Sequence, residues 1–202
     1  MGGRGGSFTS HSNRSDAYNF FGVGNSGSAY EDWYRNIDNV EEEEVNKYTG
    51  PWYQTVNAVL RSDDVYYDLD AYEQMEVDYS IASLDTAIAK FDLKKNLKVF
   101  RGSTSDLVGG YTTVEEINAN LKGAIVRDKA YMSTSADKKS PFTDEIRYEI
   151  QVPKGKGRGA FVAPISKFKS EDEFLLKRGT KFKVLGAVNR NGDVVVKLKV
   201  VD

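Results

Sequence analysis

The sequence contains no cysteine, a single histidine and no long hydrophobic run. The absence of cysteine excludes disulfides, thiolate zinc sites and a cysteine nucleophile. The single histidine, His11, lies in a Gly/Ser-rich stretch, so the sequence offers no suitable histidine for a Ser-His-Asp triad and too few for a histidine metal cluster. No apolar segment approaches the roughly 20 residues that a membrane helix needs, and the N-terminus lacks the apolar stretch of a signal peptide. We therefore expect no metal and no membrane insertion, with any chemistry carried by carboxylates, hydroxyls, Arg, Lys or Tyr.

The charge is distributed unevenly along the 202 residues, although its net value is only -2 at pH 7. Residues 31–92 carry sixteen acids and four bases, whereas residues 93–202 carry thirteen acids and twenty-two bases. The basic part suits an anionic ligand such as a phosphate, and the acidic part argues against nucleic acid as a partner. A solvated surface with uneven charge explains these counts equally well.

The N-terminal 28 residues differ in composition from the rest of the chain. Residues 1–28 are rich in Gly, Ser and Asn and show no hydrophobic periodicity, which predicts a flexible leader. Phe20 and Phe21 are the candidates within it for docking onto the folded part. Residues 29–202 are expected to form a single domain.

The hydrophobic pattern in the first part of this domain, residues 29–92, is helical. Four consecutive glutamates from Glu41 favour a helix start through the helix dipole. Apolar residues recur at helical spacing after the Gly50-Pro51 break and again from Ile81 to Phe91. We therefore expect a helical lobe over residues 29–92.

After residue 92 the hydrophobic period shortens and predicts strands. One strand is expected to reach Gly102, and another alternates its apolar side chains from Ile146 to Val152. Asn191-Gly192, placed between two apolar runs, is a strong signal for a two-residue hairpin turn.

One more helix is expected within residues 93–202, with Thr112 and Glu115 as its capping-box pair. Helices first and strands later indicate the α+β class. We expect an N-terminal helical lobe packed on a mostly antiparallel, two-sheet β core over residues 93–202.

Three short segments contain residues suited to chemistry. They are Val99–Gly102 (VFRG), Tyr131–Ser135 (YMSTS) and Glu171-Asp172-Glu173. Taken alone, each has an ordinary structural explanation, since an Arg at a strand end is usually exposed, Ser-Thr-Ser often forms a turn, and adjacent acids are usually solvated. If the last segment is a strand, Glu171 and Glu173 point to the same face, as acid/base chemistry requires.

In this order and spacing, the segments resemble the mono-ADP-ribosyltransferases of the arginine–serine–glutamate class. Relatives of this class include the clostridial binary toxins that act on actin. The resemblance covers about residues 30–202 and implies the ADP-ribosyltransferase-like fold. Its segments are 41–61 in the helical lobe, VFRG at 99–102, KAYMSTSAD at 129–137 and SEDEFLLKRGTKFKVL at 170–185.

The resemblance implies an NAD-dependent enzyme that transfers ADP-ribose from NAD+ to an arginine of a target protein and releases nicotinamide. By resemblance, Glu173 bonds the nicotinamide-ribose hydroxyl and stabilises the positive charge that develops on the ribose carbon. Glu171 would hold the acceptor, because a glutamate at this position accompanies arginine acceptors in the family. A carboxylate matches the fork of guanidinium donors and can accept the proton that arginine must lose.

The resemblance assigns further residues to the dinucleotide. Arg101 would pair with the NAD pyrophosphate, Gly102 would allow close backbone approach to the nicotinamide amide, and Ser133 would position Glu173 and the nicotinamide ribose. The remaining candidates are Asn57 near the dinucleotide, Phe142 stacked on nicotinamide, Arg147 as a second phosphate contact, and Phe168 in acceptor recognition.

Other functions remain open at this point. The same fold could mainly hydrolyse NAD, could modify an acceptor other than arginine, or could be an inactive NAD-binding or interaction module. The predicted acceptor loop, residues 163–170, is basic because it carries Lys167 and Lys169, which leaves the acceptor protein open. The place of action is expected to be cytoplasmic. It would be the host bacterium for a phage-encoded effector, or the target cell for a toxin, whose delivery would need other chains.

Overall fold

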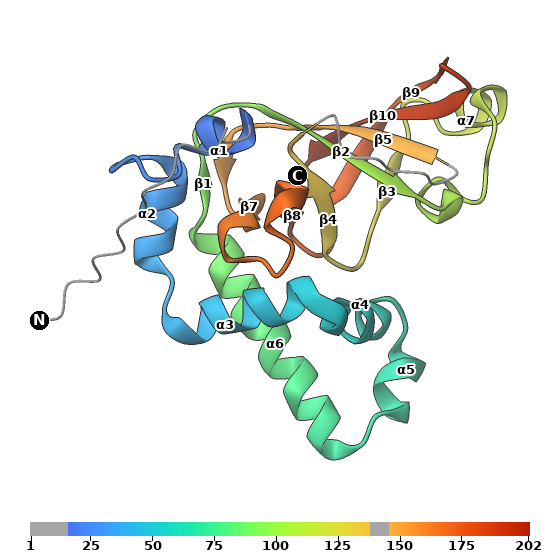
Figure 1. Ribbon diagram of the computed structural model, residues 1–202. Helices are drawn as coiled ribbons and strands as arrows, with labels where there is room; N and C mark the ends of the chain where they lie inside the picture. The colour runs from blue at the N-terminus through green and yellow to red at the C-terminus, as the bar shows by residue number, and fades with distance from the viewer. Residues whose placement is uncertain (1–15, 138–145) are drawn as a thin grey trace, which may run out of the picture.

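The computed structural model describes residues 16–137 and 146–202, and most of its helices lie to one side of its strands (Figure 1). The helices are α1 (Asp16–Phe21), α2 (Ala29–Asn36), α3 (Asn39–Lys47), α4 (Tyr53–Arg61), α5 (Asp63–Asp68), α6 (Ala71–Lys90) and α7 (Val114–Asn120). The shorter helical turns are η1 (Tyr48–Trp52), η2 (Ser105–Val108), η3 (Ala163–Ile165) and η4 (Lys169–Glu171). The strands are β1 (Asp92–Leu93), β2 (Leu97–Ser103), β3 (Ile125–Arg127), β4 (Met132–Ser135), β5 (Ile146–Val152), β6 (Gly155–Lys156), β7 (Gly159–Phe161), β8 (Glu173–Leu176), β9 (Lys181–Arg190) and β10 (Asp193–Val201).

Acidic residues connect the two central helices of the helical lobe. A capping box between Asp38 and Glu41 starts α3. Glu41 is buried and forms an ion pair with Lys90 at the end of α6, with 2.6 Å between Nζ and Oε1. Glu44, one turn further along α3, accepts a hydrogen bond from the buried Ser80 hydroxyl of α6. The run of glutamates therefore starts a helix, as expected, and two of its members also join α3 to α6.

Eight strands pair in the order β3-β9-β10-β5-β2-β4-β8-β7, while β1 and β6 form a separate two-stranded ladder. β5 and β10 are parallel, and the other pairings among the described strands are antiparallel. Only one residue pair, Phe100 with Ser135, joins β2 to β4. The continuous order therefore divides at this point into two parts. The expected α+β class, with a helical lobe and a mostly antiparallel core, is confirmed.

Local signals for strands and turns are largely confirmed. Residues of β5 alternate between buried and exposed from Ile146 to Val152. Asn191 and Gly192 join β9 to β10 with φ values of 55° and 91°, as a type I′ hairpin turn requires. The capping pair of α7 was wrong by one residue, because the N-cap is Thr113 and its partner is Glu116.

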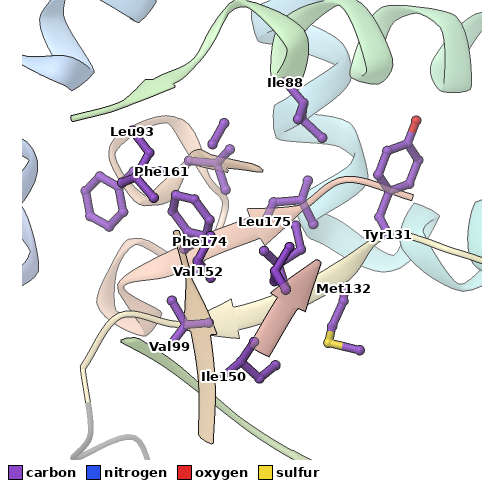
Figure 2. Packing of buried hydrophobic residues seen from close by; sticks show 14 of the residues in the cluster. Ile88, Leu93, Val99, Tyr131, Met132, Ile150, Val152, Phe161, Phe174 and Leu175 are labelled. Carbon is purple, nitrogen blue, oxygen red and sulfur yellow. The ribbon is translucent and has the colours of Figure 1, made fainter. Parts of the chain in front are cut away.

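The main hydrophobic core lies between the sheet and the helical lobe. Figure 2 shows Val99 of β2 beside Ile150 of β5, with Leu175 of β8 and Ile88 of α6 in the same cluster. All four side chains are buried. Because β8 is buried along its whole length, the strand that begins with Glu173 is held on both faces.

The prediction of a flexible leader over residues 1–28 was wrong for residues 16–28, while residues 1–15 lie outside the described ranges. Phe21 of α1 is only 1% exposed. Its ring stacks on Phe161 of β7 with 4.1 Å between centroids and on Phe174 of β8 at 5.7 Å. The expected docking of Phe21 therefore occurs, and it makes the segment part of the core.

Phe21→Ala is predicted to destabilise the protein by about 3–5 kcal/mol, as truncation of a buried aromatic residue usually does. Phe20→Ala is the matched control, because Phe20 is 41% exposed and its truncation should cost about 1 kcal/mol or less. Urea unfolding of the two variants measures the difference. Equal, small effects would mean that this segment is not part of the folded domain.

Candidate active site

Arg101, Ser133 and Glu173 come from three strands that are neighbours in the sheet, namely β2, β4 and β8. Nη1 of Arg101 donates a hydrogen bond to the backbone oxygen of Ser133 at 2.7 Å. The Ser133 side chain lies close enough to the Glu173 carboxylate to lower the pKa of that group. The structure thus brings together three of the predicted residues, close to the single residue pair that connects the two parts of the sheet.

The carboxylate of Glu173 lies in a buried, partly polar environment, since the residue is only 5% exposed. Burial raises its pKa to about 7, because the charged form loses its hydration. Hydrogen bonds from the Ser133 and Ser166 side chains favour the charged form, as does the positive charge of Arg101. The negative charge of Glu171 opposes it. Glu173 is therefore a carboxylate whose ionisation is balanced near neutral pH.

Glu171 does not lie in a strand, so the condition under which Glu171 and Glu173 would point to the same strand face is not met. Glu171 ends the short helical turn η4, where its backbone N–H donates to the oxygen of Phe168 at 3.1 Å. Asp172 then adopts a left-handed conformation with φ of 48° before β8 begins. This turn leaves Glu171 exposed and Glu173 buried. The two carboxylates are still close enough for Glu171 to raise the pKa of Glu173.

The helical lobe contributes a buried tyrosine to this region. Tyr48 lies close enough to Glu173 and Arg101 for both charges to affect its pKa, which burial raises strongly. Its hydroxyl donates to Oδ1 of Asn57 at 3.2 Å, and Nδ2 of Asn57 donates to the backbone oxygen of Tyr131 at 3.4 Å. Asn57 thus connects α4 to the segment that leads into β4, and its contact with a dinucleotide stays a prediction.

The loop between β7 and β8 is anchored to the helical lobe at two backbone positions. Nδ2 of Asn46 donates to the oxygen of Ile165 at 2.8 Å, and the N–H of Lys167 donates to Oγ1 of Thr49 at 3.0 Å. The next residue, Phe168, is 52% exposed. The loop therefore presents an aromatic side chain to solvent from a fixed backbone, beside Glu171.

Sequence reasoning did not single out the residues that anchor this loop or Ser166 beneath it. Tyr48 and Thr49 were part of the resemblance in the helical lobe, but no local pattern links them to a loop more than a hundred residues away. Ser166 lies in a stretch with no periodic signal. Its proximity to Glu173 arises from the tertiary fold alone.

For three predicted dinucleotide contacts, no side-chain interaction among the described residues places them beside Ser133 and Glu173. Arg147 pairs with Asp193 at 3.0 Å, and it lies opposite Gly102 in the ladder, on the other face of the sheet from Arg101. This orientation does not favour the predicted phosphate contact, which stays a prediction. Gly102 is buried within β2, and its approach to nicotinamide also stays a prediction. Phe142 lies outside the described residues.

Nowhere in residues 16–137 and 146–202 do three His, Cys, Asp or Glu side chains gather as a metal ion would require. None of the helices in these ranges combines the length and the apolar character needed to span a bilayer.

The raised pKa of Glu173 predicts how the protein's stability depends on pH. The neutral acid favours the folded state below the unfolded pKa near 4.5, and this contribution is lost as the pH rises through about 7. Glu173→Gln, which stays neutral, should therefore match the wild type near pH 5 and exceed its stability at pH 8 by up to about 3 kcal/mol. Urea unfolding at the two pH values measures the stability of Glu173→Gln relative to the wild type. A relative stability that falls from pH 5 to pH 8 would contradict the prediction.

Comparison with known proteins gives relatives along most of the chain. The chain is 28% identical to NAD(+)--arginine ADP-ribosyltransferase EFV of Enterococcus faecalis over 177 residues, which cover 82% of this chain and 32% of that protein. It is 34% identical to mono(ADP-ribosyl)transferase SpvB of Salmonella typhimurium over 95 residues, 47% of this chain and 14% of that protein. The chain thus spans a third or less of these curated relatives.

Among solved structures, Plx2a, an ADP-ribosyltransferase toxin from Paenibacillus larvae, has a similar fold. The TM-score is 0.78 at 22% identity, with 94% of this chain and 98% of that chain covered. The family model for the ADP-ribosyltransferase exoenzyme matches residues 26–201, which include Arg101, Ser133, Glu171 and Glu173. The chain belongs to the ADP-ribosyltransferase exoenzyme family.

Proposed function

We propose that this protein transfers one ADP-ribose unit from NAD+ to an arginine of a target protein. The observation that carries this proposal is the pair of carboxylates with contrasting environments. Glu173 is buried near Ser133 and Arg101, whereas Glu171 is exposed at the end of the acceptor loop. A buried group suits the bound dinucleotide, and an exposed group suits an arginine on another protein. The name of the Enterococcus faecalis relative, an arginine ADP-ribosyltransferase, supports this choice of acceptor.

In the proposed reaction, the bond between the ribose carbon and the nicotinamide nitrogen breaks, and both electrons leave with neutral nicotinamide. The ribose carbon becomes positively charged, and the ionised carboxylate of Glu173 stabilises this charge. At about 4 Å and an effective dielectric constant of about 20, the attraction is on the order of 4 kcal/mol. Only the part that grows between ground state and transition state accelerates the reaction.

Arg101 is proposed to bind the pyrophosphate of NAD+. Its hydrogen bond to the Ser133 backbone oxygen uses one of the five guanidinium donors and fixes the plane of the group. The other N–H groups can then donate to two phosphate oxygens in bidentate geometry. Because the Ser133 side chain also lies beside the Glu173 carboxylate, the Arg101 contact would align the phosphate site with the carboxylate that faces the ribose.

Glu171 is proposed to bind the acceptor arginine and to take the proton that its nitrogen loses as the new bond to ribose forms. A guanidinium does not lose a proton unaided near neutral pH, so an adjacent carboxylate serves both binding and proton transfer. Phe168 would contact the acceptor protein from the same loop. The flanking residues Lys167 and Lys169 are exposed, which favours an acceptor whose arginine is surrounded by acidic residues.

Two alternatives are distinguished by their products. An enzyme that mainly hydrolyses NAD+ would release free ADP-ribose and modify no acceptor. An inactive module would bind NAD+ without cleaving it. The burial of Glu173 favours an enzyme, because burying a carboxylate costs stability and strongly shifted pKa values gather at catalytic sites.

The test incubates labelled NAD+ with agmatine, a free guanidine, and the purified protein. Glu173→Gln should lose transfer and most NAD+ cleavage, because no charge remains to stabilise the ribose carbon. Glu171→Gln should lose transfer to agmatine but keep much of the hydrolysis, because water needs no guanidinium site. Glu115→Gln on the exposed surface of α7 is the matched control and should behave as the wild type.

An equal loss of transfer and hydrolysis in the Glu171 and Glu173 variants would contradict the proposed division of roles. Free ADP-ribose without an agmatine adduct from the wild-type protein would favour the hydrolase. Binding of NAD+ in a calorimeter with neither product would favour the inactive module.

The place of action follows from the acceptor. A bacterial target would place the enzyme in the cytoplasm of a host bacterium, as a phage-encoded effector would require, whereas a delivered toxin would act in the cytoplasm of its target cell. Mass spectrometry of ADP-ribosylated peptides from a bacterial lysate treated with enzyme and NAD+ would identify the acceptor.

A further inference from the structure

Ser166 is a buried residue of the acceptor loop, and its hydroxyl lies near the proposed catalytic carboxylate of Glu173. It lies in the loop that connects β7 to β8, directly after η3, and is only 1% exposed. Its neighbours Lys167 and Phe168 are exposed. The serine therefore points inward from a loop whose next residues face solvent, and it requires polar partners inside the protein.

The Ser166 side chain has two polar neighbours. It lies close enough to the Glu173 carboxylate to lower the pKa of that group, as a hydroxyl directed at the charged form does. Its Oγ accepts a hydrogen bond from the backbone N–H of Phe168 at 3.0 Å. One hydroxyl thus contacts both the catalytic carboxylate and the backbone of the exposed aromatic residue.

The backbone around Ser166 is held in place from several directions. Its own N–H donates to the oxygen of Val162 at 2.9 Å, and the N–H of Val162 donates to the backbone oxygen of Glu173 at 3.0 Å. On either side of the serine, Ile165 and Lys167 are bonded to the helical lobe. The hydroxyl position is therefore set by the β core and the helical lobe together.

We propose that Ser166 is a positioning residue that orients the Glu173 carboxylate and couples it to the acceptor loop. Together with Ser133 it provides two hydroxyl donors, one from β4 and one from the loop, to the same buried group. This proposal rests on the proposed transferase function, because it assigns Ser166 a role in ionising and orienting Glu173. It also predicts that the conformation of the loop at Phe168 and the state of the carboxylate depend on one another.

Removal of the Ser166 hydroxyl should change the ionisation of Glu173, which general loosening of the loop would not do. The charged form of Glu173 loses one of two hydroxyl donors, so its pKa rises further and a smaller fraction is ionised at neutral pH. The N–H of Phe168 also loses its acceptor. NAD+ binding should change little, because Ser166 contacts the carboxylate and not the phosphate-binding candidate Arg101.

The experiment measures NAD+ cleavage and agmatine transfer by the full chain over pH 5.5 to 9. Ser166→Ala should lower kcat at pH 7 by on the order of tenfold or more, with KM for NAD+ within about twofold of the wild type. The pH at which activity reaches half its maximum should rise by about one pH unit. Ser166→Thr, which keeps a hydroxyl, should recover most of the activity.

The matched control is Ser170→Ala, which removes an exposed hydroxyl from the same loop and should leave kcat and the pH profile unchanged. Ser166→Cys keeps the shape of serine with a weaker donor and should shift the half-maximal pH upward by less than Ser166→Ala. This variant also tests the proposal should the alanine variant fail to fold.

A lower kcat with an unchanged half-maximal pH in folded Ser166→Ala or Ser166→Cys would overturn the proposal, because it would mean a structural role alone. An equal effect of Ser170→Ala would overturn it as well. Failure of the proposed function looks different, since the wild-type protein would then form no agmatine adduct at any pH.

Discussion

The architecture of the candidate active site depends on the burial of one carboxylate, that of Glu173, at the start of a strand that is buried along its length. Burial alone would keep this group neutral, because an isolated charge is strongly disfavoured in an apolar interior. The hydroxyls of Ser133 and Ser166 and the charge of Arg101 oppose that effect. The balance leaves a substantial fraction of the group ionised near neutral pH, which the proposed stabilisation of the ribose carbon requires.

Much of the remaining structure fixes the positions of the side chains that set the pKa of Glu173. The sheet order places Ser133 on β4, next to β8, and Arg101 on β2, the strand beyond β4. From the helical lobe, Asn46 and Thr49 fix the backbone of the loop that contains Ser166. From the N-terminal side, α1 packs against β7 and β8, and the ring of Tyr18 meets that of Phe161 edge to face at 5.5 Å. Segments far apart in sequence thus converge on β8 and on the loop that precedes it.

Local patterns in the sequence predicted most elements, because strand alternation, turn chemistry and helical spacing depend on near neighbours. The hairpin at Asn191-Gly192 is one example. The same patterns failed where long-range packing decides the structure. Phe21 stands in a glycine-rich segment, and its partners Phe161 and Phe174 are distant in sequence, so no local pattern indicated that α1 is folded.

The candidate site shows the same limit. The order of the motifs was sufficient to predict that Arg101, Ser133 and Glu173 lie together, and they do so on three consecutive strands of the sheet. It could not reveal that Asp172 turns left-handed and moves Glu171 out of the strand, since that conformation depends on the loop around it. Nor could it reveal Ser166, whose role arises from tertiary contacts alone.

The most direct test of the central claim is the ionisation of Glu173 itself. A pH titration of the protein labelled with ¹³C at glutamate Cδ, with the Glu173 signal assigned by its absence in Glu173→Gln, reports this pKa by NMR. We predict a midpoint near 7 in the absence of NAD+. A midpoint near 4.5, the ordinary value for glutamate, would show that the carboxylate is freely hydrated and would contradict the buried, hydrogen-bonded site described above.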